Sequence, residues 1–170
     1  MRWTSTSTRR SVVTGCCGGQ QRRILTPGKN QKRYLAGALA ADGGELVVVD
    51  GERKTADLFL RLLEELRRRH PTARRIHVVL DNYVIHKTQK VQAYLEQEGL
   101  CFNLLFLPPY CPDDNRIERL WRELHANVTR NHRCNTIGQL MGRVRFYLAA
   151  ESRRRCRLRS ASAPRLRDAA

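Results

Sequence analysis

Hydrophobic and polar positions follow two periodicities along the chain, and each periodicity predicts one kind of element. Residues 34–41 and 46–49 are short apolar runs joined by an Asp-Gly-Gly turn at 42–44, which predicts a β-hairpin. Residues 54–70 carry apolar side chains at helical spacing with charges between them. This pattern predicts an amphipathic helix that ends before Pro71.

Two short apolar runs in the second half of the chain, 76–80 and 101–107, predict buried strands. Between them, residues 87–98 place their apolar side chains on one helical face, and Gly99 follows as a left-handed cap. The segment therefore predicts a strand, a helix and a second strand.

Two helices are predicted after the proline-rich connection at 108–112. The first begins near Asp113 or Asp114, and its apolar positions are in helical phase: Ile117, Leu120, Trp121, Leu124 and Val128. The second covers 136–150. Because strands and helices alternate, we expect an α/β fold with a mixed sheet flanked by helices.

Charge is distributed unevenly over the 170 residues. The formal net charge is +16, and residues 1–41 hold eight basic residues and no acid, whereas residues 42–150 hold 17 basic and 14 acidic residues. Residues 151–170 add seven arginines and two acids. The excess favours a polyanionic partner, nucleic acid and not a membrane, although arginine-rich ends can also be solvated tails without a target.

We expect one globular domain, because the length leaves no room for two large ones. Its predicted limits are 21–150, preceded by a poorly ordered segment at 1–20 and followed by a basic tail at 151–170. No stretch of 18 apolar residues predicts a membrane span, and no apolar core near residue 1 predicts a signal peptide. The six cysteines are therefore expected to be reduced thiols.

Two acids stand at positions that suit metal chemistry. Asp81 directly follows the strand predicted at 76–80. Glu118 lies in the first turns of the helix predicted to begin near Asp113 or Asp114. Carboxylates from two such elements can converge on Mg²⁺, which prefers oxygen ligands. Each acid also has an ordinary interpretation, since Asp-Asn after a strand is often only a turn and Glu near a helix start compensates the dipole.

The sequence motifs around Asp81 and Glu118 resemble those of a known protein family. The segments VLDNYVIHKT and FLPPYCPDDNRIERLWREL, with 36 residues between Asp81 and Glu118, resemble DDE transposases of the mariner superfamily, in its bacterial insertion-sequence branch. TPGKNQKRYLAGAL at 26–39 is similar to another family segment. Cys111 and Arg116 depart from the family's usual Ser and Pro.

The resemblance implies an RNase H-like fold and cleavage and joining of DNA ends with Mg²⁺ or Mn²⁺. Asp81 and Glu118 would be the second and third acids of the triad and metal ligands, and Asn82, His86 and Asn115 would be supporting residues. The implied partners are transposon ends and target DNA, with a possible homodimer and no membrane. The implied location is the bacterial cytoplasm, at the nucleoid.

The family's first catalytic Asp has no counterpart at the expected place. No acid precedes Asp42, which lies in the predicted hairpin turn, and Asp50 ends the next strand. We therefore expect an N-terminally truncated, catalytically incomplete copy whose first strand is missing or disordered. A codon argument suggests a frameshift over residues 1–18, because Met1-Arg2-Trp3 can be encoded so that another frame reads Asp-Glu-Val.

Two other functions compete with a transposase catalytic domain. The chain could be a non-enzymatic DNA-binding remnant that acts through its basic tails. It could also bind zinc, but its cysteines at 16, 17, 101, 111, 134 and 156 lack the spacing of tetrahedral sites. Trp121 could stack on bases, although its helical spacing favours the core.

Overall fold

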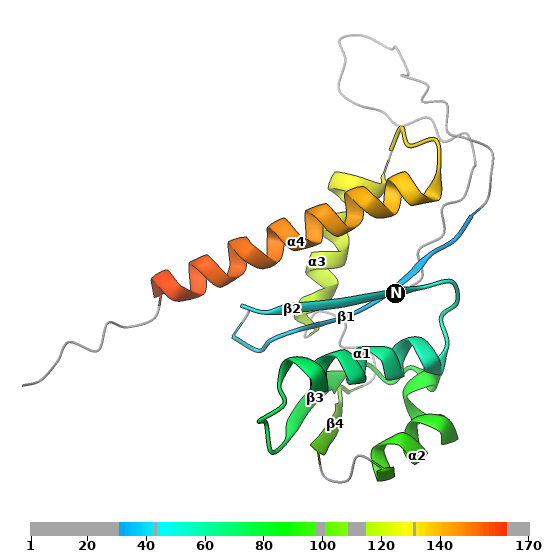
Figure 1. Cartoon of the computed structure of the whole chain (residues 1–170), viewed down its shortest axis with the longest axis vertical. Helices are drawn as coiled ribbons and strands as arrows, with labels where there is room; N and C mark the ends of the chain where they lie inside the picture. The colour runs from blue at the N-terminus through cyan, green and yellow to red at the C-terminus, as the bar shows by residue number, and fades with distance from the viewer. Residues whose placement is uncertain (1–30, 43, 98–100, 109–114, 131, 163–170) are drawn as a thin grey trace, which may run out of the picture.

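A computed structural model describes residues 31–42, 44–97, 101–108, 115–130 and 132–162 (Figure 1). The fold is mixed α/β, as the pattern predicts. In chain order the elements are β1 (Tyr34–Leu39), β2 (Leu46–Gly51), α1 (Ala56–Arg69), β3 (Ile76–Leu80), the 3-10 turn η1 (Val84–Lys87), α2 (Gln89–Gln97), β4 (Phe102–Phe106), α3 (Arg116–Leu124), the π-helical turn η4 (His125–Thr129) and α4 (Ile137–Ser162).

The predicted hairpin is confirmed: β1 and β2 pair antiparallel, with Tyr34 opposite Gly51 and Leu39 opposite Leu46. Successive strand residues point to opposite faces. Alternate residues of both strands consequently pack on two different sides, one against α1 and the other against α3 and α4. The hairpin is thus a central layer between helices (Figure 1).

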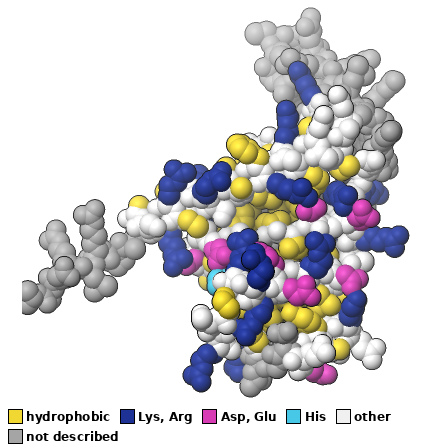
Figure 2. All heavy atoms as spheres, in the orientation of Figure 1, with side chains coloured by type: hydrophobic (Ala, Val, Ile, Leu, Met, Phe, Trp, Pro, Cys, Tyr) yellow, Lys and Arg dark blue, Asp and Glu magenta, His cyan; other side chains and the backbone are white. Residues whose placement is uncertain are grey.

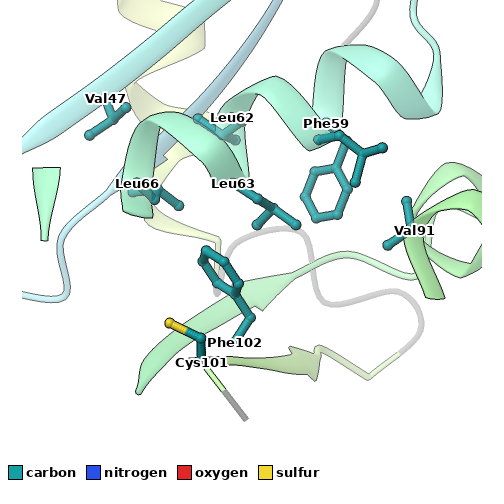
Figure 3. Close-up of a cluster of buried hydrophobic side chains, with 9 residues drawn as sticks. Val47, Phe59, Leu62, Leu63, Leu66, Val91, Cys101 and Phe102 are labelled. Carbon is teal, nitrogen blue, oxygen red and sulfur yellow. The ribbon is translucent and has the colours of Figure 1, made fainter. Parts of the chain in front are cut away.

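The larger core lies between β2, α1 and the second half of the chain. Leu63 of α1 is fully buried, and Val91 of α2 and Phe102 of β4 pack into the same cluster (Figure 3). Helix α1 points Phe59, Leu62, Leu63 and Leu66 into this cluster because these residues recur at the three- to four-residue spacing of one helical face. This helix therefore joins the hairpin to the segment from β3 to β4.

The second core covers the other face of the hairpin. Leu120, Trp121 and Leu124 of α3 pack with Val144 of α4, and Trp121 is only 4% exposed. Trp121 therefore belongs to the core and not to a base-stacking surface. Its indole ring lies against Gly37 of β1, where an added Cβ would be 2.9 Å from Cζ2.

The strands β3 and β4 pair in parallel, with Ile76 opposite Phe102 and Leu80 opposite Phe106. Their inner residues pack against the α1 core. Val79 and Leu105, which alternate with those residues, are 56% and 45% exposed. The sheet formed by β3 and β4 consequently has one covered and one open face.

The expectation of one mixed sheet is wrong for the described residues. The four strands form two separate two-stranded sheets, one antiparallel and one parallel. A cavity of about 510 Å³ is lined by β1 from one sheet and by β3 from the other, and by side chains of α1 and α3. β1 and β3 are not paired with each other, and both border this cavity.

The predicted end of the last helix at Ala150 is also wrong, because α4 continues to Ser162. Side-chain contacts hold this extension: Glu151 pairs with Arg154 and Arg155, and Arg159 pairs with Asp42 at 2.9 Å. The start predicted for α3, at 113 or 114, lies outside the described residues, as do the segment 1–20 and Gly99. None of the described helices is long and apolar enough to cross a membrane.

Candidate active site

Asp81 is the first residue after β3, at the carboxyl end of the parallel sheet. Its side chain is 63% exposed. One carboxylate oxygen, Oδ1, lies 3.2 Å from Nε2 of His86 and accepts a 3.4 Å hydrogen bond from the backbone N–H of Tyr83. The other oxygen, Oδ2, has no hydrogen-bond partner among the described residues and is open to a ligand.

His86 lies in η1 and is largely buried, with its ring edge-on to Phe59 at a centroid distance of 4.4 Å. Burial lowers the pKa of His86 below its ordinary value, and the nearby Asp81 carboxylate opposes this shift. Within the described part of the chain, its Nδ1 is buried without a hydrogen-bond partner. A proton there would lack an acceptor, so the neutral ring with Nε2–H donating to Asp81 suits this environment.

Asn82 ties together the ends of the two parallel strands. Its side-chain amide donates to the carbonyl of Leu107, and its oxygen accepts a 3.0 Å hydrogen bond from Nζ of Lys87. The backbone N–H of Leu107 in turn donates to Leu80 at 2.8 Å. Both polar atoms of Asn82 are thus engaged, one with the end of β4 and the other with η1.

Glu118 lies in the first turn of α3, whose N-cap residue is Asn115. The backbone N–H of Glu118 donates to the Asn115 carbonyl at 2.9 Å. The Glu118 side chain has no hydrogen bond or ion pair to any residue that the structure describes. Arg116, two residues earlier, instead donates to the carbonyl of Ala41 at 2.7 Å, so its charge is directed to the turn that follows β1.

Asp81, His86, Asn115 and Glu118 all line the cavity between the two sheets. Glu45 is the other acid in the described lining, and its carboxylate is paired with Arg69 at 3.3 Å and with His70 at 3.1 Å. The structure therefore brings Asp81 and Glu118 to the same cavity from different elements. That they share a metal ion stays a prediction, because no group of three or more His, Cys, Asp or Glu residues in the described ranges is arranged to hold one.

Lys54 and Tyr83 also line the cavity, and sequence reasoning missed both. The Lys54 ammonium lies 3.3 Å from the centroid of the Tyr83 ring, a cation–π contact. Lys54 comes from the connection between β2 and α1, far from Tyr83 in sequence, and no spacing pattern links them. The adjacency of Tyr83 to Asp81 and Asn82 was the only available signal.

Asp42 and Asp50 do not join this site. Neither lines the cavity; Asp42 pairs with Arg159 at 2.9 Å and Asp50 with Arg145 at 3.0 Å. Both carboxylates are directed to α4. Among the described residues, three carboxylates line the cavity: Glu45 is engaged by Arg69 and His70, whereas Oδ2 of Asp81 and the Glu118 side chain have no partner.

The site consists of two carboxylates, a histidine and an asparagine around a cavity at the end of a parallel sheet, which is suited to metal-dependent chemistry on an oxygen-rich substrate. The family model described as "DDE superfamily endonuclease" matches residues 6–141. The chain therefore belongs to the DDE endonuclease superfamily. This match includes Asp81 and Glu118 and ends in α4.

Within that superfamily, the chain is related to an insertion-element protein. It is 42% identical over 134 residues to "Insertion element IS630 uncharacterized 39 kDa protein" from Shigella sonnei, a match that covers 79% of this chain and 39% of the relative. The chain thus spans about two fifths of that relative's length. The DDE family expected from the sequence is confirmed, and the expected likeness to the insertion-sequence branch agrees with this relative.

Proposed function

We propose that Asp81 and Glu118 jointly bind Mg²⁺ or Mn²⁺ in a transposase catalytic domain that acts on DNA ends. The observation that carries this proposal is the shared cavity, which both side chains line from separate elements. Membership of the DDE superfamily implies divalent metal use and DNA as the partner. Transposon ends and target DNA are the proposed substrates.

The donors present fit a hard divalent cation. Glu118 and Oδ2 of Asp81 have no competing partner among the described residues, and carboxylate oxygens are the ligands that Mg²⁺ and Mn²⁺ accept. When bound, such an ion would act as a Lewis acid at a phosphodiester: it would favour ionisation of a water and stabilise the negative charge on the leaving oxygen.

The chain's own residues prepare Asp81 for this task. The neutral His86 ring and the Tyr83 N–H both engage Oδ1, which fixes the carboxylate plane and leaves Oδ2 toward a ligand. This is the supporting arrangement that outer residues provide to a metal ligand. Lys54 places a positive charge in the same cavity, where it can attract a phosphate.

We further propose that the gap between β1 and β3 is the place of a central strand in an RNase H-like sheet. Support comes from the two facing edges, which line one cavity along their lengths and make no ladder with each other. Such a strand would also bring a third acid to the end of the sheet. Without it, the two carboxylates can hold one ion weakly, and DNA strand transfer by this chain is proposed to be absent or slight.

Titration calorimetry with Mn²⁺ on the purified chain tests the metal proposal. We expect weak binding that falls at least tenfold in both Asp81→Asn and Glu118→Gln, since loss of even an outer-shell partner costs about 10- to 100-fold. The matched control is Asp57→Asn, because Asp57 is an equally exposed carboxylate (62%) that does not line the cavity. Unchanged binding in either site variant, or an equal loss in the control, would contradict the proposal.

A further inference from the structure

Helix α4 is the most strongly basic element of the described chain. It holds seven arginines and a single acid, Glu151, within Ile137–Ser162. Figure 1 shows it crossing the molecule on the side away from β3 and β4, and Figure 2 shows Lys and Arg side chains along the same region. Some of its arginines pair with acids of the fold, and others have no such pair among the described residues.

The inner face of α4 is fixed to the body of the protein. Val144 and Leu148 are buried in the second core, and successive residues turn by about 100° along the helix. Glu151 and Arg155 fall on that same face and pair with each other at 2.8 Å. The helix is also held near its end, where Sγ of Cys156 donates to the carbonyl of Gly44 at 3.4 Å.

The acids near α4 are already paired with other arginines of the helix. The pairs are Asp50 with Arg145 at 3.0 Å, Glu151 with Arg154 at 2.7 Å and Asp42 with Arg159 at 2.9 Å. These pairs account for the basic residues that stabilise the packing of α4. They leave a second group of arginines without such a role.

That second group lies on the opposite side of the helix. Arg143, Arg153 and Arg157 are exposed and fall within about 40° of one line along α4, about 180° from Leu148. None of the three has an acidic partner among the residues that the structure describes. Phe146 lies on the same line and is 73% exposed. These four residues are called the outer face of α4.

We propose that the outer face of α4 is a contact surface for the phosphate backbone of duplex DNA. The inference rests on the proposed function in taking DNA as the partner, and it assigns the contact to four named residues. The line from Arg143 to Arg157 is about 21 Å long at 1.5 Å per residue, which corresponds to about six base-pair steps of 3.4 Å. Guanidinium groups match phosphate geometry, and releasing counterions from the phosphates favours binding.

Phe146 fits the same surface. An exposed aromatic ring between arginines supplies apolar contact with sugars or base edges, while the arginines supply charge. A face made for a second protein molecule would instead need a larger apolar area, and here the phenylalanine is surrounded by unpaired positive charges. The charge thus favours DNA over a second copy of this chain.

Fluorescence anisotropy with a labelled DNA duplex, measured from 50 to 200 mM salt, tests the proposal. The variant Arg143→Gln/Arg153→Gln/Arg157→Gln keeps good helix formers at all three positions. We expect this variant to bind the duplex about 10- to 100-fold more weakly at 0.1 M salt. The negative slope of log K against log salt should become shallower by about 2.7, which is about 0.9 for each of three lost phosphate contacts. Phe146→Ser should weaken binding and leave the slope unchanged.

The matched control removes the same charge from another surface, with Arg61→Gln/Arg68→Gln/Arg74→Gln on and beside α1. An equal loss in this control would show a general effect of net charge and overturn the assignment. A wild-type chain that does not bind the duplex would overturn it too, as would a Phe146→Ser variant that dissociates a dimer in sedimentation. The Mn²⁺ titration at Asp81 and Glu118 is independent of these results, so the two proposals can fail separately.

Discussion

His86 combines a buried ring with a direct contact to the site carboxylate. Its Nε2 faces Oδ1 of Asp81, while Nδ1 is enclosed and has no acceptor in the described part of the chain. Burial against Phe59 lowers its pKa, because the charged ring would lose solvation. The residue is therefore packed into the fold by Phe59 and at the same time holds one oxygen of Asp81.

This environment predicts a pH-dependent stability. Above the ordinary histidine pKa of 6.5 the ring is neutral in both folded and unfolded chains. Below pH 6.5 the histidine of the unfolded chain binds a proton, whereas His86 of the folded chain has a lower pKa and binds it less readily. The free energy of unfolding should therefore fall as the pH drops through 6.5. We expect His86→Gln to show a shallower fall than wild type in urea unfolding measured between pH 7.5 and 5.5.

His125 and His132 provide the comparison for this measurement. Burial lowers the pKa of both rings as well, and neither lies in the cavity lining. Each should retain its own share of the pH dependence when His86 is replaced. Identical pH dependence in wild type and His86→Gln would show that His86 is not held neutral by the fold.

For single residues, the sequence predicted which side chains to consider better than it predicted their burial and contacts. The Asp81 and Glu118 positions could be predicted, because both acids stand beside distinctive words and at element ends. The burial of His86 and the Lys54 contact with Tyr83 could not, because each depends on residues far apart in sequence. The hydrogen bond from Arg116 to the Ala41 carbonyl could not be predicted either, since the two residues are 75 positions apart.

At the level of elements, the contact between α3 and β1 makes a sharp prediction. In Gly37→Ala the new methyl group would lie 2.9 Å from Cζ2 of Trp121 and 3.2 Å from Cδ1 of Ile117. Because both neighbours are buried, we expect a destabilisation of about 1–3 kcal/mol, the usual cost of overpacking a core. Thermal or urea unfolding measures it.

The matched substitution for this prediction is Gly142→Ala. Gly142 is an exposed residue within α4, and nothing lies within 4 Å of an added Cβ. Alanine should therefore stabilise the chain by about 0.5–1 kcal/mol, because glycine is a poor helix former. Opposite signs for the two glycines are expected, and a neutral Gly37→Ala would contradict the close packing of Trp121.

Helices and strands were predicted well where the hydrophobic periodicity is strong, and poorly where tertiary contacts set the length or pairing of an element. The hairpin, α1 and the two short strands follow directly from their patterns. The length of α4 did not, because arginine-rich residues after Ala150 show no apolar period and are held by pairs with Asp42 and Glu151. The separation of the strands into two sheets depends on pairing between edges, which a local pattern does not contain.

In the molecule as a whole, Asp81 and Glu118 are the two cavity carboxylates that we propose to bind the metal ion. The described residues bring Asp81 and Glu118 to the cavity, while Asp42 and Asp50 are engaged by arginines of α4. We predict that the purified chain nicks supercoiled plasmid in Mg²⁺ no faster than its Asp81→Asn variant prepared in parallel. Gel quantification of nicked circles measures this, and faster Mg²⁺-dependent nicking by the wild type would contradict it.

The hypothesis of a frameshift concerns residues 1–18, which lie outside the described residues. The family match begins at residue 6, so part of this segment aligns with the family in the frame given. The hypothesis stays a prediction that the DNA upstream of Met1 can test in all three frames. A reading that excludes Asp-Glu there would end it.

The proposed function depends on one metal ion being shared by Asp81 and Glu118. NMR of the ¹⁵N-labelled chain tests it most directly, because substoichiometric Mn²⁺ broadens the amide signals of residues around its binding site. We expect the amides of Asp81, Asn82 and Glu118 to broaden together, while those of Asp57 and Glu65 on α1 stay sharp. Broadening at only one of the two site acids, or equally at acids over the whole surface, would contradict it.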